Sequence, residues 1–452
     1  MLQATEKTIV AIATPIGTGG VAMIRISGKK AFEVGQIIFS RNLSQIPSHQ
    51  MVYGKILGKN QEVLDDVMLV KLVSPKSFTG EDTIEIFCHG SLIIQRNIVH
   101  RCIEAGAIAA LPGEFSYQAF MNGKMDLAQA EAIQELIGAK NEYALKAAEE
   151  QLKGSLSLKI KHFQDSLLES AAIIDAWVDY PEEGLEFKTK EEILSDLQLV
   201  LDQMKQLKNS FHDGQKLNVN IKLCLLGAPN AGKSSLMNAL LGYDRAIVTP
   251  IAGTTRDLLQ EELHLFGMAF SLIDTAGIRE SAGLIEKEGI KRSILAAENA
   301  DLILYVIDSC KPVQQKEKET ISSLPKEKTI IIYNKADLQL PNKLFPHLQE
   351  IALSAKELSG IEDLKQAIES KVFSAISFDK DQVMITKERH HEALIEAIEN
   401  LQNVIDGLAL DVSAEFISFD LRMSLKALGR IIGFDLSESI LDSIFSKFCV
   451  GK

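Results

Sequence analysis

The stretch GAPNAGKSSL, residues 227–236, lies between the apolar run VNIKLCLLG and the helix-forming run SLMNALLG. It matches the G-x-x-x-x-G-K-[ST] pattern of a phosphate-binding loop, whose glycine-rich backbone cradles phosphate groups. Lys233 is expected to reach the β- and γ-phosphates, and the Ser234 hydroxyl is expected to bind Mg²⁺. The strand-loop-helix context is the one that such a loop requires. The stretch therefore predicts a nucleoside triphosphate site and leaves the base open.

Four later motifs specify the base. They are TTRD at 254–257, DTAG at 274–277, NKAD at 334–337 and SAK at 354–356. Each is expected at the carboxyl end of an apolar strand, which is where ligands bind in open α/β sheets. The Asp337 carboxylate can accept two hydrogen bonds from guanine, and adenine cannot reproduce that arrangement. The order and spacing of these motifs after the phosphate-binding loop predict a GTP-binding domain.

The expected GTP site draws on all of these motifs. Its residues are Asn230, Ala231, Gly232, Lys233, Ser234, Ser235, Thr249, Thr254, Thr255, Asp274, Thr275, Ala276, Gly277, Asn334, Lys335, Asp337, Ser354 and Ala355, with Ser234 and Thr255 as Mg²⁺ ligands. Ile278 follows DTAG, where many small GTPases place a glutamine that orients the attacking water. Ile278 cannot hydrogen-bond water, so another group must do so. Glu286 is a candidate, although IEKEGIKR around it also fits a solvated helix face.

A cation site beside the phosphates is a second candidate feature. Asn230 and the segment TPIAGTT at 249–255 could hold a monovalent cation whose charge replaces that of an arginine finger.

Composition limits the remaining possibilities. The 452 residues carry a formal net charge of −13, which argues against a protein that coats nucleic acid through bulk charge. No run approaches the ~20 apolar residues of a membrane span. The start, MLQATEKTIVAIATPIG, does not resemble a secretory signal. The 5 cysteines form no C-x-x-C pair, so we expect neither disulfides nor a zinc site, and we expect a cytoplasmic protein.

The distribution of residue types along the chain predicts an architecture in which one domain is inserted into another. Residues 1–120 alternate Val- and Ile-rich strands with helices and form an N-terminal α/β domain. Residues 121–214 and 379–452 are poor in glycine and proline and show helical periodicity, so we predict one helical domain built from both parts. Residues 215–378 form the GTPase domain. The predicted fold class is therefore α/β plus all-α, with a P-loop, Ras-like GTPase domain inserted into the helical domain.

Several stretches resemble the tRNA modification GTPase (MnmE, also TrmE) family over essentially the whole chain. They are TIVAIATPIGTGGVAMIRISG, SFTGEDTIEIFCHG, LPGEFSYQAFMNGKMDLAQAEAI, the nucleotide motifs and the terminal FCVGK. The resemblance implies a homodimer that works with the flavoprotein MnmG (GidA). Together they are expected to add a C5 aminomethyl or carboxymethylaminomethyl group to the wobble uridine (U34) of certain tRNAs. A folate, 5-formyltetrahydrofolate or a relative, is the implied one-carbon donor.

The resemblance also assigns roles to residues. Arg25, Glu85, Lys124 and Lys452 match folate-binding positions, and Cys449 matches a cysteine needed for the modification. Asn230, Thr249, Ile251 and Thr254 match a K⁺ site, and Glu286 matches the residue that orients the water. Pro250 stands where an acidic residue is frequent, and SAGLIE replaces a more acidic run before Glu286. Carbonyl ligation of K⁺ tolerates a proline, whereas the second departure weakens the match at Glu286.

Two alternatives from other classes stay open. One is a ribosome-assembly GTPase of the Era group, which would carry an RNA-binding KH module or a second GTPase domain, and the sequence displays neither. The other is a folate-dependent one-carbon transferase with a merely regulatory GTPase. Whether the chain itself contacts tRNA, or only through its partner, does not follow from the sequence.

Overall fold

The computed structural model describes residues 7–139, 141–179, 188–218, 221–243, 262–265, 268–272, 297, 299–373 and 383–451. The chain divides into two compact units. The first consists of Met1–Ile137, Glu149–Lys205 and Arg389–Lys452, and the second of Gly138–Ala148 and Gln206–Glu388. Each unit is described by itself.

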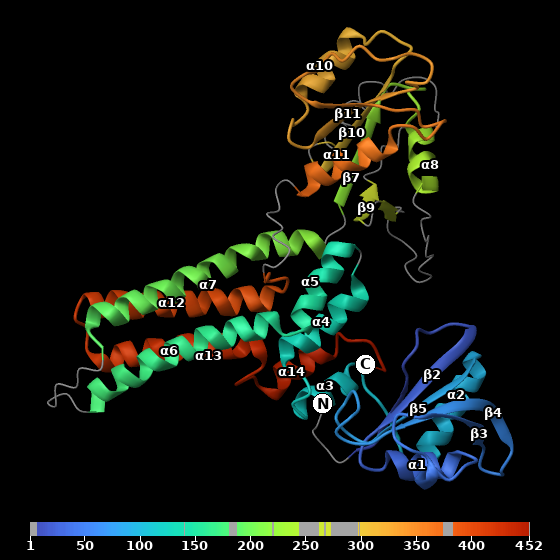
Figure 1. The fold of residues 1–452 in the computed structure, drawn as a ribbon, viewed down its shortest axis with the longest axis vertical. Helices are drawn as coiled ribbons and strands as arrows, with labels where there is room; N and C mark the ends of the chain where they lie inside the picture. Colours follow the sequence, from blue (N-terminus) through green and yellow to red (C-terminus); the bar gives the residue numbers. More distant parts are fainter. Residues whose placement is uncertain are drawn as a thin grey trace. The chain divides into compact units, whose positions relative to one another are not determined.

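The first unit begins with a sheet in the order β3-β4-β5-β2-β1-β6, of which β2 to β5 are labelled in Figure 1. Its strands are β1 Ile9–Ile12, β2 Gly19–Ser27, β3 Met51–Leu57, β4 Val63–Leu72, β5 Thr83–Gly90 and β6 Ile108–Ala109. All pairs are antiparallel except β1 with β6. The Val- and Ile-rich strands predicted within residues 1–120 are present, and this prediction is confirmed.

Two helices, α1 Ala31–Ile38 and α2 Leu92–Glu104, pack with the strands into one core. Because neighbouring strand residues point to opposite faces, Ile24 and Ile26 of β2 enter this core, while Arg25 between them faces the other side. That other side carries a smaller cluster of Ile9, Ala11 and Phe115. The sheet therefore places Arg25 on the face away from the two helices.

The helical part of the first unit is assembled from distant segments. Its elements are α3 Glu114–Met121, α4 Leu127–Gly138, α5 Glu142–Leu152, α6 Ser155–Asp179, α7 Lys190–Asn218, α12 Glu388–Ala409, α13 Ala414–Ile432 and α14 Glu438–Phe445, of which α4, α5, α7 and α12 extend into segments of the second unit. Helix α6 lies along α13 (Figure 1). Lys205 of α7 donates to Gln402 of α12 (3.3 Å). Segments before and after the GTP-binding motifs thus form one helical body, as predicted.

The second unit contains a largely parallel sheet. Among its described residues the order is β12-β11-β10-β7-β9-β8, and only the β8 and β9 pair is antiparallel. The strands are β7 Ile221–Gly227, β8 Glu262–Leu265, β9 Met268–Leu272, β10 Leu302–Asp308, β11 Thr329–Asn334 and β12 Gln349–Ala352. The parallel strands β7, β10 and β11 end together, because Val306 pairs with Gly227 and Asp308 with Asn334.

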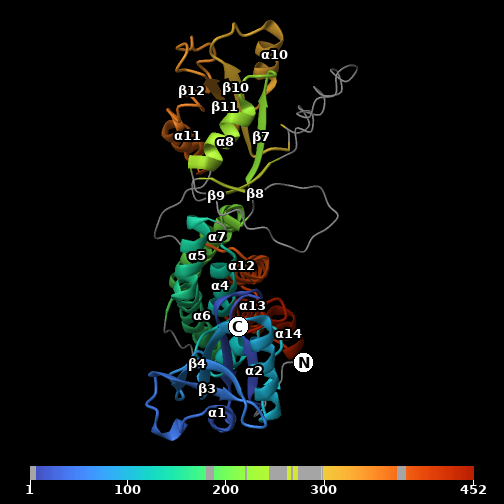
Figure 2. The same ribbon diagram turned by 90° about the vertical axis from the view of Figure 1, so that its right-hand side faces the viewer.

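Helices cover both faces of this sheet (Figure 2). Helices α8 Lys233–Tyr243 and α11 Ile361–Phe373 pack on Leu223, Leu304 and Ile332. On the other face α10 Gln315–Ser323 packs against alternate residues of the same strands. This three-layer α/β arrangement confirms the predicted insertion of a P-loop fold into a helical domain. The residue limits 120, 214 and 378 of the predicted domains stay predictions.

No helix among the residues that the structure describes is both long and apolar enough to cross a membrane.

Candidate functional site: the phosphate-binding loop and its surroundings

The loop between β7 and α8 has the backbone that a phosphate-binding loop requires. Gly227 has φ 137°, Gly232 has φ 95° and Asn230 has φ 65°. These conformations favour glycine and tolerate asparagine. A Cβ atom at Gly232 would lie 2.1 Å from Asn334 Nδ2, and one at Gly227 would lie 2.1 Å from the Val306 carbonyl oxygen. Both glycines are therefore required by close approach as well as by φ.

Lys233 begins α8 and turns back over this loop. Its Nζ donates to the carbonyl oxygens of Gly227 (2.7 Å) and Ala228 (2.9 Å). Burial lowers the pKa of this ammonium. Within the described part of the chain it forms no ion pair with a carboxylate. A half-buried cation held only by backbone carbonyls is suited to an incoming anion such as a phosphate.

Asn334 joins three predicted motifs. It ends β11, and its side chain is only 2% exposed. Its Nδ2 donates to the Ala231 carbonyl (3.1 Å), and its Oδ1 accepts from the Lys335 (2.8 Å) and Ala355 (3.1 Å) amides. The structure thus brings the phosphate-binding loop, NKAD and SAK together around one buried amide.

Lys335 contacts a residue that the sequence analysis did not single out. Its Nζ lies 2.7 Å from Asp308 Oδ2 at the end of β10, and it donates to the Asn230 carbonyl (3.3 Å). Burial raises the pKa of Asp308, but the bonds from Lys335 and from the Cys310 amide, with the charge of Lys335, outweigh burial and hold that pKa below its usual range. A charged Asp308 therefore fixes Lys335 beside the loop.

The remaining described nucleotide residues lie near these groups. Ser234 and Ser235 are exposed in the first turn of α8, and Asp337 is exposed just after β11. Ser354 is buried, and its Oγ accepts from the Glu357 amide (3.2 Å). The predicted residues Thr249, Ile251, Thr254, Thr255, Asp274, Thr275, Ala276, Gly277 and Glu286 lie outside the described residues, as does Ile278.

In the first unit, Arg25 and Glu85 face each other across β2 and β5. The Arg25 Nε and Nη2 atoms lie 3.0 Å and 2.9 Å from Glu85 Oε1. Their side chains are only 13% and 18% exposed, so solvent screens this pair less than a surface pair. The guanidinium also lies over the rings of Phe78 (5.2 Å) and Phe115 (5.7 Å). Two of the predicted folate residues thus form one ordered polar group on the face away from α1 and α2.

The other predicted folate residues come from further along the chain. Lys124 is exposed, and its Nζ donates to the Pro75 carbonyl (3.0 Å). Lys452 lies outside the described residues. The preceding Gly451 packs so closely on β1 that a Cβ atom there would lie 2.3 Å from the Ile12 carbonyl oxygen. The C-terminal segment therefore returns to the N-terminal domain of its own chain.

Cys449, which was predicted to serve the modification, lies in this returning segment. It is exposed, and its carbonyl accepts from the Gly113 amide (3.3 Å).

Known families account for both parts of the first unit. A family model described as "MnmE helical domain" matches residues 127–449, and one described as "GTP-binding protein TrmE N-terminus" matches residues 8–124. The chain belongs to the MnmE family. A tRNA modification GTPase MnmE from Protochlamydia amoebophila is 52% identical over 449 residues, 99% of this chain and 98% of that protein. The MnmE of Chlamydia trachomatis serovar L2 is 40% identical over 450 residues, 99% of each chain.

Among solved structures, the FeoB G domain from Methanococcus jannaschii is 25% identical. It covers 34% of this chain and 98% of its own, with a TM-score of 0.25, which is too low to support a conclusion. Assignment to MnmE rests on the family models and on the full-length relatives.

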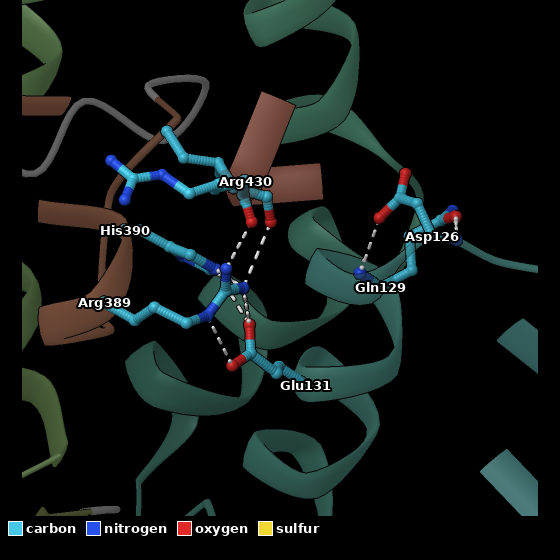
Figure 3. A network of polar contacts seen from close by, with 7 residues as sticks. Asp126, Gln129, Glu131, Arg389, His390 and Arg430 are labelled. Atoms are coloured by element: carbon cyan, nitrogen blue, oxygen red, sulfur yellow. Dashed lines mark hydrogen bonds and ion pairs between the residues drawn. The ribbon is translucent and has the colours of Figure 1, made fainter. Parts of the chain in front are cut away.

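Two polar groups of this MnmE-family chain were not predicted from the sequence. Asp308 ends the apolar run LILYVID, and an acidic residue at the end of a parallel strand beside NKAD could have been found from that pattern. The second group joins Glu131 to Arg389 and His390, more than 250 positions later (Figure 3). No local sequence signal pairs residues so far apart.

Proposed function

We propose that this MnmE-family GTPase depends on K⁺ and acts with the flavoprotein MnmG on the wobble uridine (U34) of certain tRNAs. Family membership makes the chain a GTP hydrolase of tRNA modification. The proposed product carries an aminomethyl or carboxymethylaminomethyl group at C5, and the proposed carbon donor is 5-formyltetrahydrofolate or a related folate. The proposal includes a homodimer in the cytoplasm, with tRNA bound mainly through the partner.

The proposed GTP binding is supported by Asn334, whose side chain joins three of the nucleotide motifs. Its amide holds the loop at Ala231 and the SAK segment at Ala355 in one arrangement. Lys233 supplies a positive charge beside this loop that can bind a phosphate group. The phosphate-binding loop and Lys233 fit the phosphates of GTP. Ser234, at the start of α8, is the first proposed Mg²⁺ ligand, and Thr255 is the second proposed Mg²⁺ ligand.

The proposed K⁺ site uses Asn230, with Thr249, Ile251 and Thr254. The Asn230 side chain is exposed, and its carbonyl already contacts the Lys335 ammonium. A cation there would supply the positive charge that an arginine finger supplies in other GTPases. Glu286 is proposed to orient the attacking water, because Ile278 cannot.

The proposed folate site uses Arg25, Glu85, Lys124 and Lys452. Its donor set fits the ligand: a carboxylate can accept pterin N–H groups, and guanidinium or ammonium groups can hold glutamyl carboxylates. When bound, the folate would supply a one-carbon unit at the formyl oxidation level. In this chain Glu85 is already oriented by Arg25, and Arg25 by the rings of Phe78 and Phe115.

The decisive test is the nucleoside profile of tRNA from cells that lack the protein. We expect unmodified wobble uridine, restored by the wild-type gene and not by a Lys233→Ala variant. A profile that does not change when the protein is lost would overturn the proposed reaction.

The base is tested separately. Asp337→Asn should shift nucleotide preference from guanine toward xanthine, because the carboxylate's two acceptors bind the guanine N–H groups. A variant that keeps its GTP affinity would contradict the proposed role of Asp337.

A further inference from the structure

The loop between β4 and β5, residues 73–82, contacts the proposed folate residues of the first unit. Its Phe78 ring is one of the two rings beside the Arg25 guanidinium, whose Cζ lies 5.2 Å from the ring centroid. Phe78 also packs against the smaller cluster on the same face of the sheet. The loop then leads into β5, where Glu85 is the third residue. The loop therefore connects the side chain that orients Arg25 to the strand that carries Glu85.

The same loop holds Lys124 at two points. The Lys124 Nζ donates to the Pro75 carbonyl (3.0 Å). Gly80 has φ 79°, and a Cβ atom there would lie 3.1 Å from Lys124 Cγ, so the loop backbone lies directly on the lysine stem. Three of the four proposed folate residues, Arg25, Glu85 and Lys124, are thus connected to one loop.

Thr79 fixes this loop to two other parts of the domain. It is 0% exposed, and its Oγ1 lies 2.6 Å from the Oγ of Ser27. The Thr79 carbonyl accepts from Asn122 Nδ2 (2.8 Å). The first bond joins the loop to β2, and the second joins it to the segment that carries Lys124.

The bond between Thr79 and Ser27 belongs to a buried network of hydroxyl groups. Ser27 Oγ donates its one proton to Glu81 Oε2 (3.2 Å), so Thr79 donates the bond between the two hydroxyls. Thr83 Oγ1 donates to the Glu81 carbonyl (3.1 Å), and the Glu81 amide donates to Thr79 Oγ1 (3.2 Å). Ser27, Thr79 and Thr83 are all 0% exposed. A buried network whose members all have partners is rigid, and the loss of one member leaves others unpaired.

This network lies on the face of the sheet that carries the proposed folate residues. Ser27 is two positions after Arg25 on β2, so both side chains point to the same face. Thr83 is likewise two positions before Glu85 on β5. Ser27 pairs with Thr83, and Arg25 pairs with Glu85. The hydroxyl network is thus the next row of side chains beside the ion pair, and Thr79 joins this row to the loop.

We propose that Thr79 is a positioning residue of the folate site, which holds the Phe78 ring against Arg25 and the loop backbone against Lys124. The inference rests on the proposed function, because it assumes that Arg25, Glu85 and Lys124 bind the folate. Thr79 itself is fully buried, so it acts through its two sequence neighbours, one beside the guanidinium and one on the lysine stem. A residue that only stabilised the domain would change the melting temperature and leave the folate affinity of the folded protein unchanged.

Calorimetric titration of the full-length protein with 5-formyltetrahydrofolate tests this role. Thr79→Val keeps the branched shape and removes the hydroxyl, which deprives the Glu81 amide of its acceptor and Ser27 of a donor. We expect about ten-fold weaker folate binding, since each such bond is worth roughly two-fold to ten-fold. Thr79→Ser keeps the hydroxyl and should bind the folate within about two-fold of the wild type.

Thr8→Val is the matched control, because it makes the same substitution at another buried threonine of this domain. Thr8 is 5% exposed, and its Oγ1 accepts from the Lys30 amide (2.9 Å) at the start of α1. Helix α1 packs on the face of the sheet opposite to Arg25. Thr8→Val should therefore lower the melting temperature and keep the wild-type folate affinity.

A double-mutant cycle tests whether Thr79 acts through Lys124. Lys124→Ala removes the side chain that Pro75 and Gly80 contact. In this background we expect Thr79→Val to weaken folate binding only about three-fold, because the contact with Arg25 alone remains to be disturbed. A double variant whose loss equals the product of the two single losses would overturn the proposed positioning of Lys124.

Should Thr79→Val fail to fold, as judged by its melting curve, Asn122→Ala decides. It removes the other bond at Thr79 from an exposed position, and it should weaken folate binding in the same way. A folded Thr79→Val with wild-type affinity overturns the proposed role. An equal loss in Thr8→Val also overturns it, because the effect would then come from stability. A wild-type protein that does not bind 5-formyltetrahydrofolate overturns the proposed folate site itself, and with it this role.

Discussion

Replacement of Asn334 by alanine tests whether the assembly of the nucleotide site depends on one buried amide. The side chain makes three hydrogen bonds, to Ala231, Lys335 and Ala355, and it is 2% exposed. A net value of about 1 kcal/mol for each bond gives about 3 kcal/mol. Since 1.4 kcal/mol is tenfold, this corresponds to about a hundred-fold weaker nucleotide binding if the ordered loop is the binding-competent form.

The assay is a fluorescence titration of a labelled GDP with the full-length protein. Asn342→Ala is the control, because Asn342 is an exposed asparagine in the segment between β11 and β12. It should bind nucleotide as the wild type does. Melting curves should show a lower stability for Asn334→Ala, and circular dichroism at the assay temperature should show that the variant is folded.

The contrary result is well defined. If folded Asn334→Ala binds GDP within about three-fold of the wild type, the three bonds contribute less than about 1 kcal/mol to the binding-competent loop. The sheet register alone would then bring the motifs together, and the Asn334 side chain would not be needed to hold the loop in its binding-competent form.

Three further predictions concern the proposed chemistry. GTP turnover should rise in K⁺ and hardly in Na⁺, since the charge proposed beside Asn230 can be worth ~10³ or more in rate, and equal turnover in the two salts would refute the cation site. Glu286→Ala should keep its GTP affinity and slow turnover by roughly 10² to 10⁴, whereas a parallel collapse of affinity would make Glu286 structural. Deletion of Gly451 and Lys452 should weaken 5-formyltetrahydrofolate binding in a calorimetric titration and abolish tRNA modification while GTPase activity remains, and wild-type folate affinity would remove the C-terminus from the site.

Much of the fold was predictable because its signals are local. Apolar runs in residues 1–120 predicted β1 to β5 within a few residues, and the periodic runs around α12, α13 and α14 predicted those helices. The nested order followed because helical segments lie on both sides of the GTP-binding motifs. Short elements such as β6, with two residues, carry too little pattern to be recognised.

The predictable part of the site is the part that motifs encode. Gly227, Gly232 and Lys233 lie as the phosphate-binding pattern requires, because their conformations follow from short-range geometry. Asp308 was missed, since its pairing with Lys335 depends on the register of β10 and β11. The Glu131–Arg389 pair was also missed, since it joins positions 258 residues apart and exists only once the helices have packed.

Gly451 returns to β1 and lies close to the strand that pairs with the Arg25 strand. On β1, Ile12 pairs with Ile24 and Ala11 pairs with Arg25, so the carbonyl that Gly451 approaches lies one position from the strand partner of Arg25. Gly451 has φ 94°, and a side chain there would collide with Ile12, so glycine is needed to bring the terminus this close. Gly451 and β1 are thus in close contact, although the whole set of GTP-binding motifs lies between them in the sequence.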